Sequence, residues 1–551
     1  MRRSFTKITR YNRSQKFFQR QRSIRINQSR NVSSIDTTVK LDFRDTGLHS
    51  DVVNAIHNAG FHEPLKAQQD SIPRMILTDA NVPHRVVASE TGSGKTLTYL
   101  SSISHDFCSF SSDRDHEHPH AAALVLCPNQ TLCEQVHRTA ERLIDDKNNK
   151  KPLLVSEILS GNTAPKIDTD STYRTNLYIS TPGSLVNHME NFMDRGRQRH
   201  FVRNLKHLVL DEADSLLTRG YEASLRKVFV FLAYGDVFRK GVNNSDRKDL
   251  AKFIRRMMWR HEKSEYSGNN KSPRIFFVGA TMPSRGKKSA GAIVRRVFSE
   301  TADWIDESPM LHRGLENLTF EWNELPAHPK ERRKFETSDD AASYRSAIRD
   351  WELKFHSSVA DEVLMRDEEE EEEEKKKRRT PKVTVVFCRT VRRANEVAEE
   401  IRRRVEAKEE EKKAVVVTAI HKGVDASERA SYLEWLSGSS SSSSSSCIDP
   451  DGTIQRAVLV CTDTAARGLD LKHVDRVLHA DFASNAIDFV HRSGRTGRAG
   501  ESGLVTCFYT QDDYELVHAI RDSIENKKTL EPAFSRRRSF KKNIKRYNHG
   551  Q

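Results

Sequence analysis

Short apolar runs, each followed by a polar or glycine-bearing segment, recur along the chain. Examples are Val86–Ala88, Leu208–Leu210, Val385–Phe387 and Val458–Cys461. Runs this short that alternate with helix-like stretches are typical of buried parallel strands in α/β layers. A chain of 551 residues has room for two cores of about 150–250 residues each, plus tails. The pattern therefore predicts an α/β protein with two domains, each a parallel sheet with helices on both faces.

The apolar runs also exclude some classes of protein. No uninterrupted run approaches the roughly 20 residues that a membrane-spanning helix needs. The seven cysteines include no Cys-x-x-Cys pair, and several of them fall in predicted buried strands. Reduced thiols are therefore expected rather than disulfides or a zinc site.

The first apolar run leads into Ser89-Glu90-Thr91-Gly92-Ser93-Gly94-Lys95-Thr96. Backbone N–H groups of such a loop, with the N-terminus of the helix that follows, form a cradle for polyphosphate. In this pattern Lys95 meets the β- and γ-phosphates, and the Thr96 hydroxyl is a ligand of Mg²⁺.

A second motif, Asp211-Glu212-Ala213-Asp214, follows the run Leu208–Leu210. Asp211 suits the metal side of the site, binding Mg²⁺ through water, and Glu212 is placed to orient and deprotonate the attacking water. A lone Gly-Lys-Thr is often an ordinary turn, and an acidic run is usually a solvated helix face. Because both motifs occur, each directly after an apolar strand, the sequence predicts a nucleotide hydrolase.

The second half of the chain carries arginines that fit the same chemistry. His491-Arg492-Ser493-Gly494-Arg495-Thr496-Gly497-Arg498 spaces three arginines evenly in a glycine-bearing segment. Arginine is a poor core residue but stabilises the charge on a transferring phosphoryl group. The run Val458–Cys461 leads into Thr462–Asp470. This arrangement predicts a second domain that closes onto nucleotide held by the first.

In their order, these motifs resemble those of the DEAD-box ATP-dependent RNA helicases, over a span from about Phe43 to about Tyr509. The resemblance implies two tandem RecA-like domains, ATP and Mg²⁺ as cofactors, and RNA as the partner of a monomeric protein. By similarity, Phe43 stacks on adenine, Gln68 bonds the adenine edge and Asp470 contacts the ribose. Arg495 and Arg498 correspond to the arginine fingers.

The resemblance also implies an RNA path and a coupling element. Pro128 opens the counterpart of motif Ia, Thr181 and Gly183 belong to motif Ib, and Thr462 would contact an RNA phosphate. Gly279-Ala280-Thr281 takes the place of Ser-Ala-Thr, the motif III that couples ATP hydrolysis to strand separation.

The chain departs from the family pattern at several positions. Leu65 replaces the usual Thr of the adenine-reading Q motif, and Ala426 replaces a usual Gln. Asn129-Gln130-Thr131 replaces Thr-Arg-Glu in motif Ia, so one expected cation of the RNA path is absent. Gly279 removes the motif III hydroxyl. The ATP site is therefore nearly intact, whereas the RNA path and the coupling element are altered.

The expected domains are residues 36–312 (domain 1) and 313–515 (domain 2), followed by a C-terminal tail, 516–551. Three stretches are expected to be insertions: 219–273, a low-complexity segment near 330–380 that ends in Glu368–Glu374 and a basic run, and 437–452 with its eight serines at 439–446.

The positive charge lies in the tails. The net charge is +14, yet residues 1–35 hold ten Lys and Arg, and residues 536–551 hold seven, with no acidic residue in either segment. The N-terminal composition is typical of an organellar transit peptide, mitochondrial before plastid, or else of an RNA-binding arm in the nucleus or nucleolus. The C-terminal tail is expected to bind RNA phosphates, and a tail that is merely solvated is the alternative.

The expected activity is ATP hydrolysis to ADP and phosphate that unwinds short RNA duplexes or remodels RNA–protein complexes. Backbone contacts imply little sequence preference, and an organellar setting would make ribosome assembly the role and ribosomal RNA the target. An ATP-dependent RNA clamp with little unwinding is the alternative from a different class, and a DNA helicase is a third option.

Overall fold

The computed structural model describes part of the chain. The described residues are 42–77, 82–89, 92–112, 121–145, 151–159, 175–218, 220–234, 250–251, 253–255, 273–282, 289–298, 301–306, 317–329, 338–365, 382–408, 415–421, 423–424, 432, 456–463, 474–497, 501–527, 530 and 533. Both tails, the charge block at 368–379, the serine run, Cys447 and Ala426 lie outside the described residues.

The first domain contains a seven-stranded sheet in which every strand pairing is parallel. The strand order is β5-β6-β2-β7-β8-β1-β9, formed by Ser156–Ile158, Leu177–Ser180, Ala122–Leu126, Leu205–Leu210, Arg274–Gly279, His84–Ala88 and Ala302–Asp306. A short antiparallel pair, β3 (Ile144–Asp145) and β4 (Lys151–Pro152), lies apart from this sheet.

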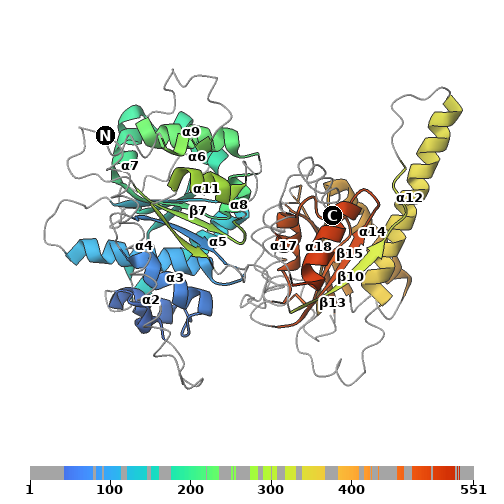
Figure 1. The fold of residues 1–551 in the computed structure, drawn as a ribbon, viewed down its shortest axis with the longest axis horizontal. Helices are drawn as coiled ribbons and strands as arrows, with labels where there is room; N and C mark the ends of the chain where they lie inside the picture. Colours follow the sequence, from blue (N-terminus) through green and yellow to red (C-terminus); the bar gives the residue numbers. More distant parts are fainter. Residues whose placement is uncertain are drawn as a thin grey trace, which may run out of the picture.

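Helices cover both faces of the first sheet (Figure 1). One face packs on η1 (Phe43–Thr46), α2 (Ser50–Asn58), α3 (Lys66–Ile76), α4 (Lys95–Ser112) and α5 (Gln130–Glu141). The other face packs on α6 (Pro182–Phe192), α7 (Arg195–Asn204), α8 (Ala213–Leu216), α9 (Glu222–Tyr234) and α11 (Ala290–Phe298). Neighbouring strand residues such as Val86 and Val87 pack in the cores on opposite faces of the sheet, because side chains alternate across a sheet.

The second domain repeats the design with a six-stranded parallel sheet in the order β10-β15-β14-β11-β13-β12. Its strands are Leu318–Glu324, Gly503–Tyr509, Arg476–His479, Lys382–Cys388, Arg456–Thr462 and Val415–Ile420. Residues of α17 (Ala486–Ser493) and α18 (Tyr514–Glu525) pack in one core, and residues of α12 (Ser338–Met365) and α14 (Val391–Ala407) pack in another. The predicted fold class, two α/β domains with parallel sheets, is confirmed.

The C-terminal boundary of the second domain differs from the sequence-based expectation. Helix α18 begins at Tyr514, and Val517, Ile520, Leu530 and Ala533 are all buried in the second-domain core. The domain therefore continues past residue 515, because an apolar helix face that lies beyond that position completes its core.

The segment near 330–380 is not low-complexity throughout. It contains α12, where Trp351, Phe355, Val359 and Val363 are buried at a spacing of four residues, the spacing of one helix face. Likewise, α9 occupies part of 219–273 and is buried through Leu225, Val228 and Phe229. These parts of the expected insertions belong to the domain cores.

The six described cysteines are free thiols, five of them buried, so the prediction of reduced cysteines holds for these positions. Among the described residues, no helix is both long and apolar enough to cross a membrane.

Candidate active site

The loop between β1 and α4 has the shape of a phosphate cradle. Gly92 and Gly94 have φ angles of 84° and 77°, a region that residues with a Cβ rarely adopt. A Cβ on Gly94 would also lie 2.3 Å from Gln68 Nε2. Lys95 Nζ donates to Ser89 O at 2.8 Å, and the hydroxyls of Ser89 and Ser93 lie 2.7 Å apart. The Lys95 ammonium therefore folds over this loop. Glu90 and Thr91 lie outside the described residues.

Asp211 and Glu212 follow β7, two strands from β1 in the sheet. Tyr99 Oη donates to Asp211 Oδ2 at 3.0 Å. Burial and the neighbouring Glu212 carboxylate raise the pKa of Asp211 to about 6, against the opposing effects of Tyr99 and Lys95. A buried carboxylate so poorly solvated would be stabilised as an anion by a cation. Asp211 therefore fits a role beside Mg²⁺.

Glu212 carries two unusual features. Its backbone is left-handed, with φ 48° and ψ 49°, and it precedes the short helix α8. Among the described residues, its buried Oε2 has no hydrogen-bond partner. Backbone strain and an unsatisfied buried acceptor both destabilise a fold, and they concentrate at functional sites. The structure thus leaves this oxygen available to bind a water, the role that the sequence predicts for Glu212.

Asp214 joins three segments of the chain. Its fully buried carboxylate accepts from Thr281 Oγ1 at 2.6 Å and Thr281 N at 3.2 Å, and from Ser215 N at 2.9 Å. His491 Nε2, from α17 of the second domain, lies 3.1 Å from Asp214 Oδ2. Figure 1 shows α17 on the side of its domain that faces the first. Asp214 therefore connects motif III to the arginine-rich segment. Sequence reasoning gave no role to Asp214 or His491, although both lie within motifs that it quoted.

Gln68 bonds the phosphate loop and its own helix. Its Oε1 accepts from Leu65 N at 2.9 Å and its Nε2 donates to Gly94 O at 3.2 Å. Leu65 precedes α3 and forms no side-chain cap, so Gln68 satisfies a backbone donor at this helix terminus. Phe43 is fully buried in the core, with its ring 6.5 Å from that of His57. Adenine stacking by Phe43 stays a prediction.

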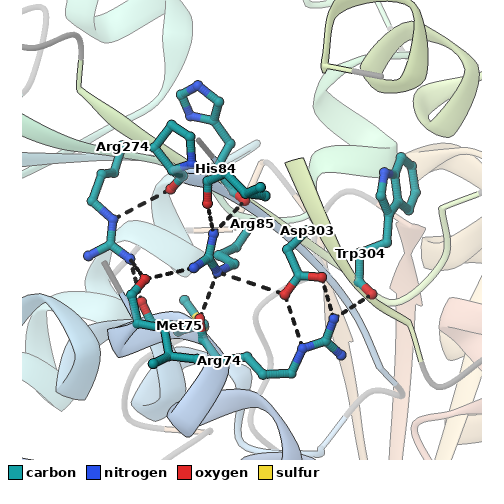
Figure 2. A network of polar contacts seen from close by, with 10 residues as sticks. Arg74, Met75, His84, Arg85, Arg274, Asp303 and Trp304 are labelled. Carbon is teal, nitrogen blue, oxygen red and sulfur yellow. Dashed lines mark hydrogen bonds and ion pairs between the residues drawn. The ribbon is translucent and has the colours of Figure 1, made fainter. Parts of the chain in front are cut away.

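Two arginines, the buried Arg85 and the partly buried Arg274, hold the other end of α3 (Figure 2). Arg85 of β1 donates to Arg74 O and to Leu77 O, each at 2.7 Å, and Arg274 of β8 donates to Met75 O. These bonds satisfy carbonyls that a helix C-terminus leaves without partners. Arg74 also pairs with Asp303 of β9. The helix that presents Gln68 is therefore fixed to the strands that lead to Ser89 and Gly279.

The arginine-rich segment of the second domain separates into two kinds of residue. Arg492 is 1% exposed and donates to both carboxylate oxygens of Asp463, at 2.6 and 2.8 Å, so it stabilises its own domain. Arg495 is also buried and donates to His491 O at 3.2 Å. Its role as an arginine finger stays a prediction, as does that of Arg498, which lies outside the described residues together with Asp470.

Comparisons with known proteins agree with this arrangement. Residues 65–288 match the DEAD/DEAH box helicase model, and residues 368–500 match the helicase conserved C-terminal domain. A DEAD-box ATP-dependent RNA helicase 22 of Oryza sativa subsp. japonica is 30% identical, with 91% of this chain and 83% of that protein covered. The protein of the same name in Arabidopsis thaliana is 29% identical, with 92% and 84% covered. The chain belongs to the DEAD-box ATP-dependent RNA helicase family.

The fold has solved counterparts as well. A structure of Mss116p bound to ssRNA and AMP-PNP aligns with a TM-score of 0.60 and 18% identity, over 90% of this chain and 80% of that one. As a member of its family, the protein is an ATP-hydrolysing RNA helicase.

Three of the four candidate RNA-binding residues of this helicase follow neighbouring strands at the carboxyl edge of the first sheet. Motifs Ia and Ib follow β2 and β6, which pair directly, and Cys127 N donates to Ser180 O at 2.9 Å. Pro128 O accepts from Tyr221 Oη at 2.9 Å, and Thr181 Oγ1 accepts from Ser184 N at the start of α6. A Cβ on Gly183 would meet nothing within 4 Å. Thr462 ends β13 in the other domain and is 8% exposed.

Proposed function

We propose that this helicase uses Mg²⁺ and ATP to separate short RNA duplexes or to remodel RNA–protein complexes, releasing ADP and phosphate in each cycle. The observation that carries the proposal is the 3.1 Å contact between His491 and Asp214. This contact joins Asp214, the last residue of the DEAD motif, to the second domain. Asp211 and Glu212, which are predicted to act on the nucleotide, are therefore only a few residues along the chain from a contact between the domains.

The residues present fit a magnesium ion. Thr96 would hold it through its hydroxyl and Asp211 through water, and hard oxygen ligands of this kind suit Mg²⁺. The ion would neutralise charge on the β- and γ-phosphates. Glu212 would orient the attacking water and take its proton, since its Oε2 has no other partner among the described residues.

RNA would be held by its backbone at Pro128, Thr181, Gly183 and Thr462. Contacts to phosphate and sugar fix an RNA strand in place but carry little sequence information. Support comes from the relatives, whose names state RNA helicase activity, and from a fold neighbour that is bound to ssRNA. Ribosomal RNA is the proposed target class and a monomer the proposed state.

The proposed setting is organellar ribosome assembly, in the mitochondrion before the plastid. It rests on the acid-free, arginine-rich composition of residues 1–35. A fluorescent reporter that carries these residues should enter an organelle. A diffuse or nucleolar reporter would contradict the proposed location and leave the enzymatic proposal intact.

An ATP-dependent RNA clamp is the second candidate, and Gly279 favours it because the motif III hydroxyl is absent. RNA-stimulated ATP hydrolysis should be measured beside displacement of a short RNA duplex by the same preparation. Displacement that requires ATP supports the helicase proposal. RNA retention and hydrolysis without displacement would establish the clamp instead, and equal stimulation by deoxy strands would favour a DNA substrate.

A further inference from the structure

The segment that follows the DEAD motif carries a tyrosine that contacts motif Ia. Tyr221 directly precedes α9 and is partly buried against the apolar core on that face of the sheet. Its Oη donates to Pro128 O at 2.9 Å, across 93 residues of the chain. Its own carbonyl accepts from Leu225 N at 2.8 Å, so the first turn of α9 fixes the backbone of the tyrosine. The sequence predicts an insertion at 219–273 and assigns it no chemistry.

The motif Ia turn between β2 and α5 is held at three consecutive residues. Cys127 N donates to the end of β6 at 2.9 Å. The Asn129 side chain caps α5 by accepting from Leu132 N at 2.9 Å. Pro128 lies between them, is buried and has no backbone N–H, so its carbonyl is the backbone group through which a hydrogen bond can hold it. Tyr221 supplies the donor.

The tyrosine is also close along the chain to the DEAD motif. It comes seven positions after Asp214, and Thr218 Oγ1, between the two, donates to Asp214 O. The strands that carry the two motifs are paired, and Asp211 N donates to Leu126 O at 2.9 Å where they end. Tyr221 therefore brings the segment after the DEAD motif back to the motif Ia turn.

Helix α9 is in turn fixed to the helix that begins at motif Ib. Leu225 of α9 and Leu185 of α6 are fully buried in the same core. Lys227 Nζ donates to Glu190 Oε1 at 3.0 Å, which ties the two helices together at the surface. Figure 1 shows α9 beside α6 on one face of the first domain. Tyr221 therefore lies where the segments that follow motifs Ia, Ib and II meet.

We propose that Tyr221 is a positioning residue for RNA binding, whose hydroxyl holds the motif Ia turn in the orientation that meets the RNA backbone. The inference rests on the proposed RNA-binding function. A buried carbonyl needs a donor, and without the tyrosine hydroxyl the peptide at Pro128 is free to reorient. RNA would then have to order the turn as it binds, at a cost in affinity.

The test is Tyr221→Phe, which removes one oxygen atom and keeps the ring that packs against the core. Binding of single-stranded RNA in the presence of AMP-PNP should weaken roughly fivefold, the factor that one hydrogen bond contributes to an equilibrium. The RNA concentration that half-saturates the ATPase should rise by the same factor, while kcat at saturating RNA stays near the parent value. Affinity for AMP-PNP without RNA should match the parent, because β1, which leads into the phosphate loop, lies three positions from β2 in the sheet.

A matched control makes the same atomic change at the other end of α9. Tyr234 is the last residue of that helix, and Tyr234→Phe should leave RNA affinity unchanged. Thermal unfolding of both variants separates positioning from stability. A lower melting temperature of Tyr221→Phe with an unchanged half-saturating RNA concentration would assign the tyrosine a structural role and overturn the proposal.

Two other results would overturn it as well. An equal loss of RNA affinity in Tyr234→Phe would show that the contact with Pro128 is not the cause. A fall in kcat without a change in the half-saturating RNA concentration would move the effect from RNA binding to the chemical step. If the parent protein binds no RNA with AMP-PNP present, the proposed RNA-binding function fails first, and the two failures are thereby distinguished.

Discussion

Gly279 offers the sharpest test of how this helicase links its ATP site to domain closure. The residue ends β8, and a Cβ placed on it would lie 3.4 Å from Asp214 Oδ1 and 3.4 Å from Thr281 O. Both are ordinary contact distances, so a serine side chain fits without displacing a neighbour. Its hydroxyl would extend from that Cβ toward Asp214, whose Oδ2 already receives Thr281 and His491.

We therefore expect Gly279→Ser to add one hydrogen bond to the carboxylate that connects the two domains. A bond of this kind contributes about 1 kcal/mol net, roughly fivefold in an equilibrium. Fixing Asp214 favours its contact with His491 and hence the closed form. Lys95, Thr96, Asp211 and Glu212 do not need the hydroxyl, so RNA-stimulated ATPase should stay within a few fold of the parent.

The measurement is duplex displaced per ATP consumed, with both quantities taken from the same reactions. Gly279→Ala is the matched control, because it adds the Cβ and stiffens the backbone without supplying a donor. Displacement per ATP should rise with serine and not with alanine. A rise in both variants would assign the effect to the backbone, and no rise in either would refute the coupling deficit inferred from Gly279.

Four further predictions concern the catalytic residues, acid stability and the C-terminal tail. Lys95→Ala should abolish hydrolysis, whereas Glu212→Gln should keep ATP binding and prolong RNA retention with ATP present; equal loss of retention in both would contradict the role of Glu212. Arg495→Ala or Arg498→Ala should slow steady-state turnover by about 10³-fold or more, and near-normal rates would exclude the finger role. Burial, with Arg85 and Arg274 nearby, lowers the pKa of His84 from 6.5 to about 3. Only the unfolded chain then takes up this proton as pH falls below 6.5, so stability declines by about 2 kcal/mol at about pH 5; urea unfolding of His84→Gln should lack that decline, and an unchanged pH profile would refute it. Deleting residues 536–551 should reduce the salt slope of RNA binding by at most roughly five, and an unchanged slope would mean a tail that does not contact RNA.

The sequence predicts this fold well where the relevant pattern is local. Strands β1 and β7 are each continuous in sequence with the motif that follows them. Their order and their chemical role can therefore be predicted without a structure. Helix α12 is harder, because the four-residue spacing of Trp351, Phe355 and Val359 lies in a segment dominated by charged residues. The charged composition of the whole segment therefore hides the buried face of this helix.

The contacts that sequence reasoning missed are those between distant positions. Asp214 and His491 are separated by 277 residues, and no spacing rule connects them. The same holds for Arg274, which bonds a carbonyl of α3 almost 200 residues earlier. Each of these residues has a buried partner that satisfies or orients it, and that requirement appears only once the strands are assembled.

The buried side chain of Gln68 does not use all of its hydrogen-bonding groups on the contacts described above. An amide has two N–H donors and an oxygen with two lone pairs. Gln68 uses one donor on Gly94 O and one lone pair on Leu65 N. Within the described part of the chain, one donor and one lone pair are therefore left for the base that Gln68 is predicted to read, and adenine presents the matching pair, an N6 donor and an N7 acceptor. Guanine presents two acceptors, O6 and N7, on the corresponding edge. With its oxygen held by Leu65 and its nitrogen by Gly94, the amide cannot flip to match guanine without breaking both bonds. If Gln68 reads the base edge as predicted, its contacts with Leu65 and Gly94 would favour ATP over GTP.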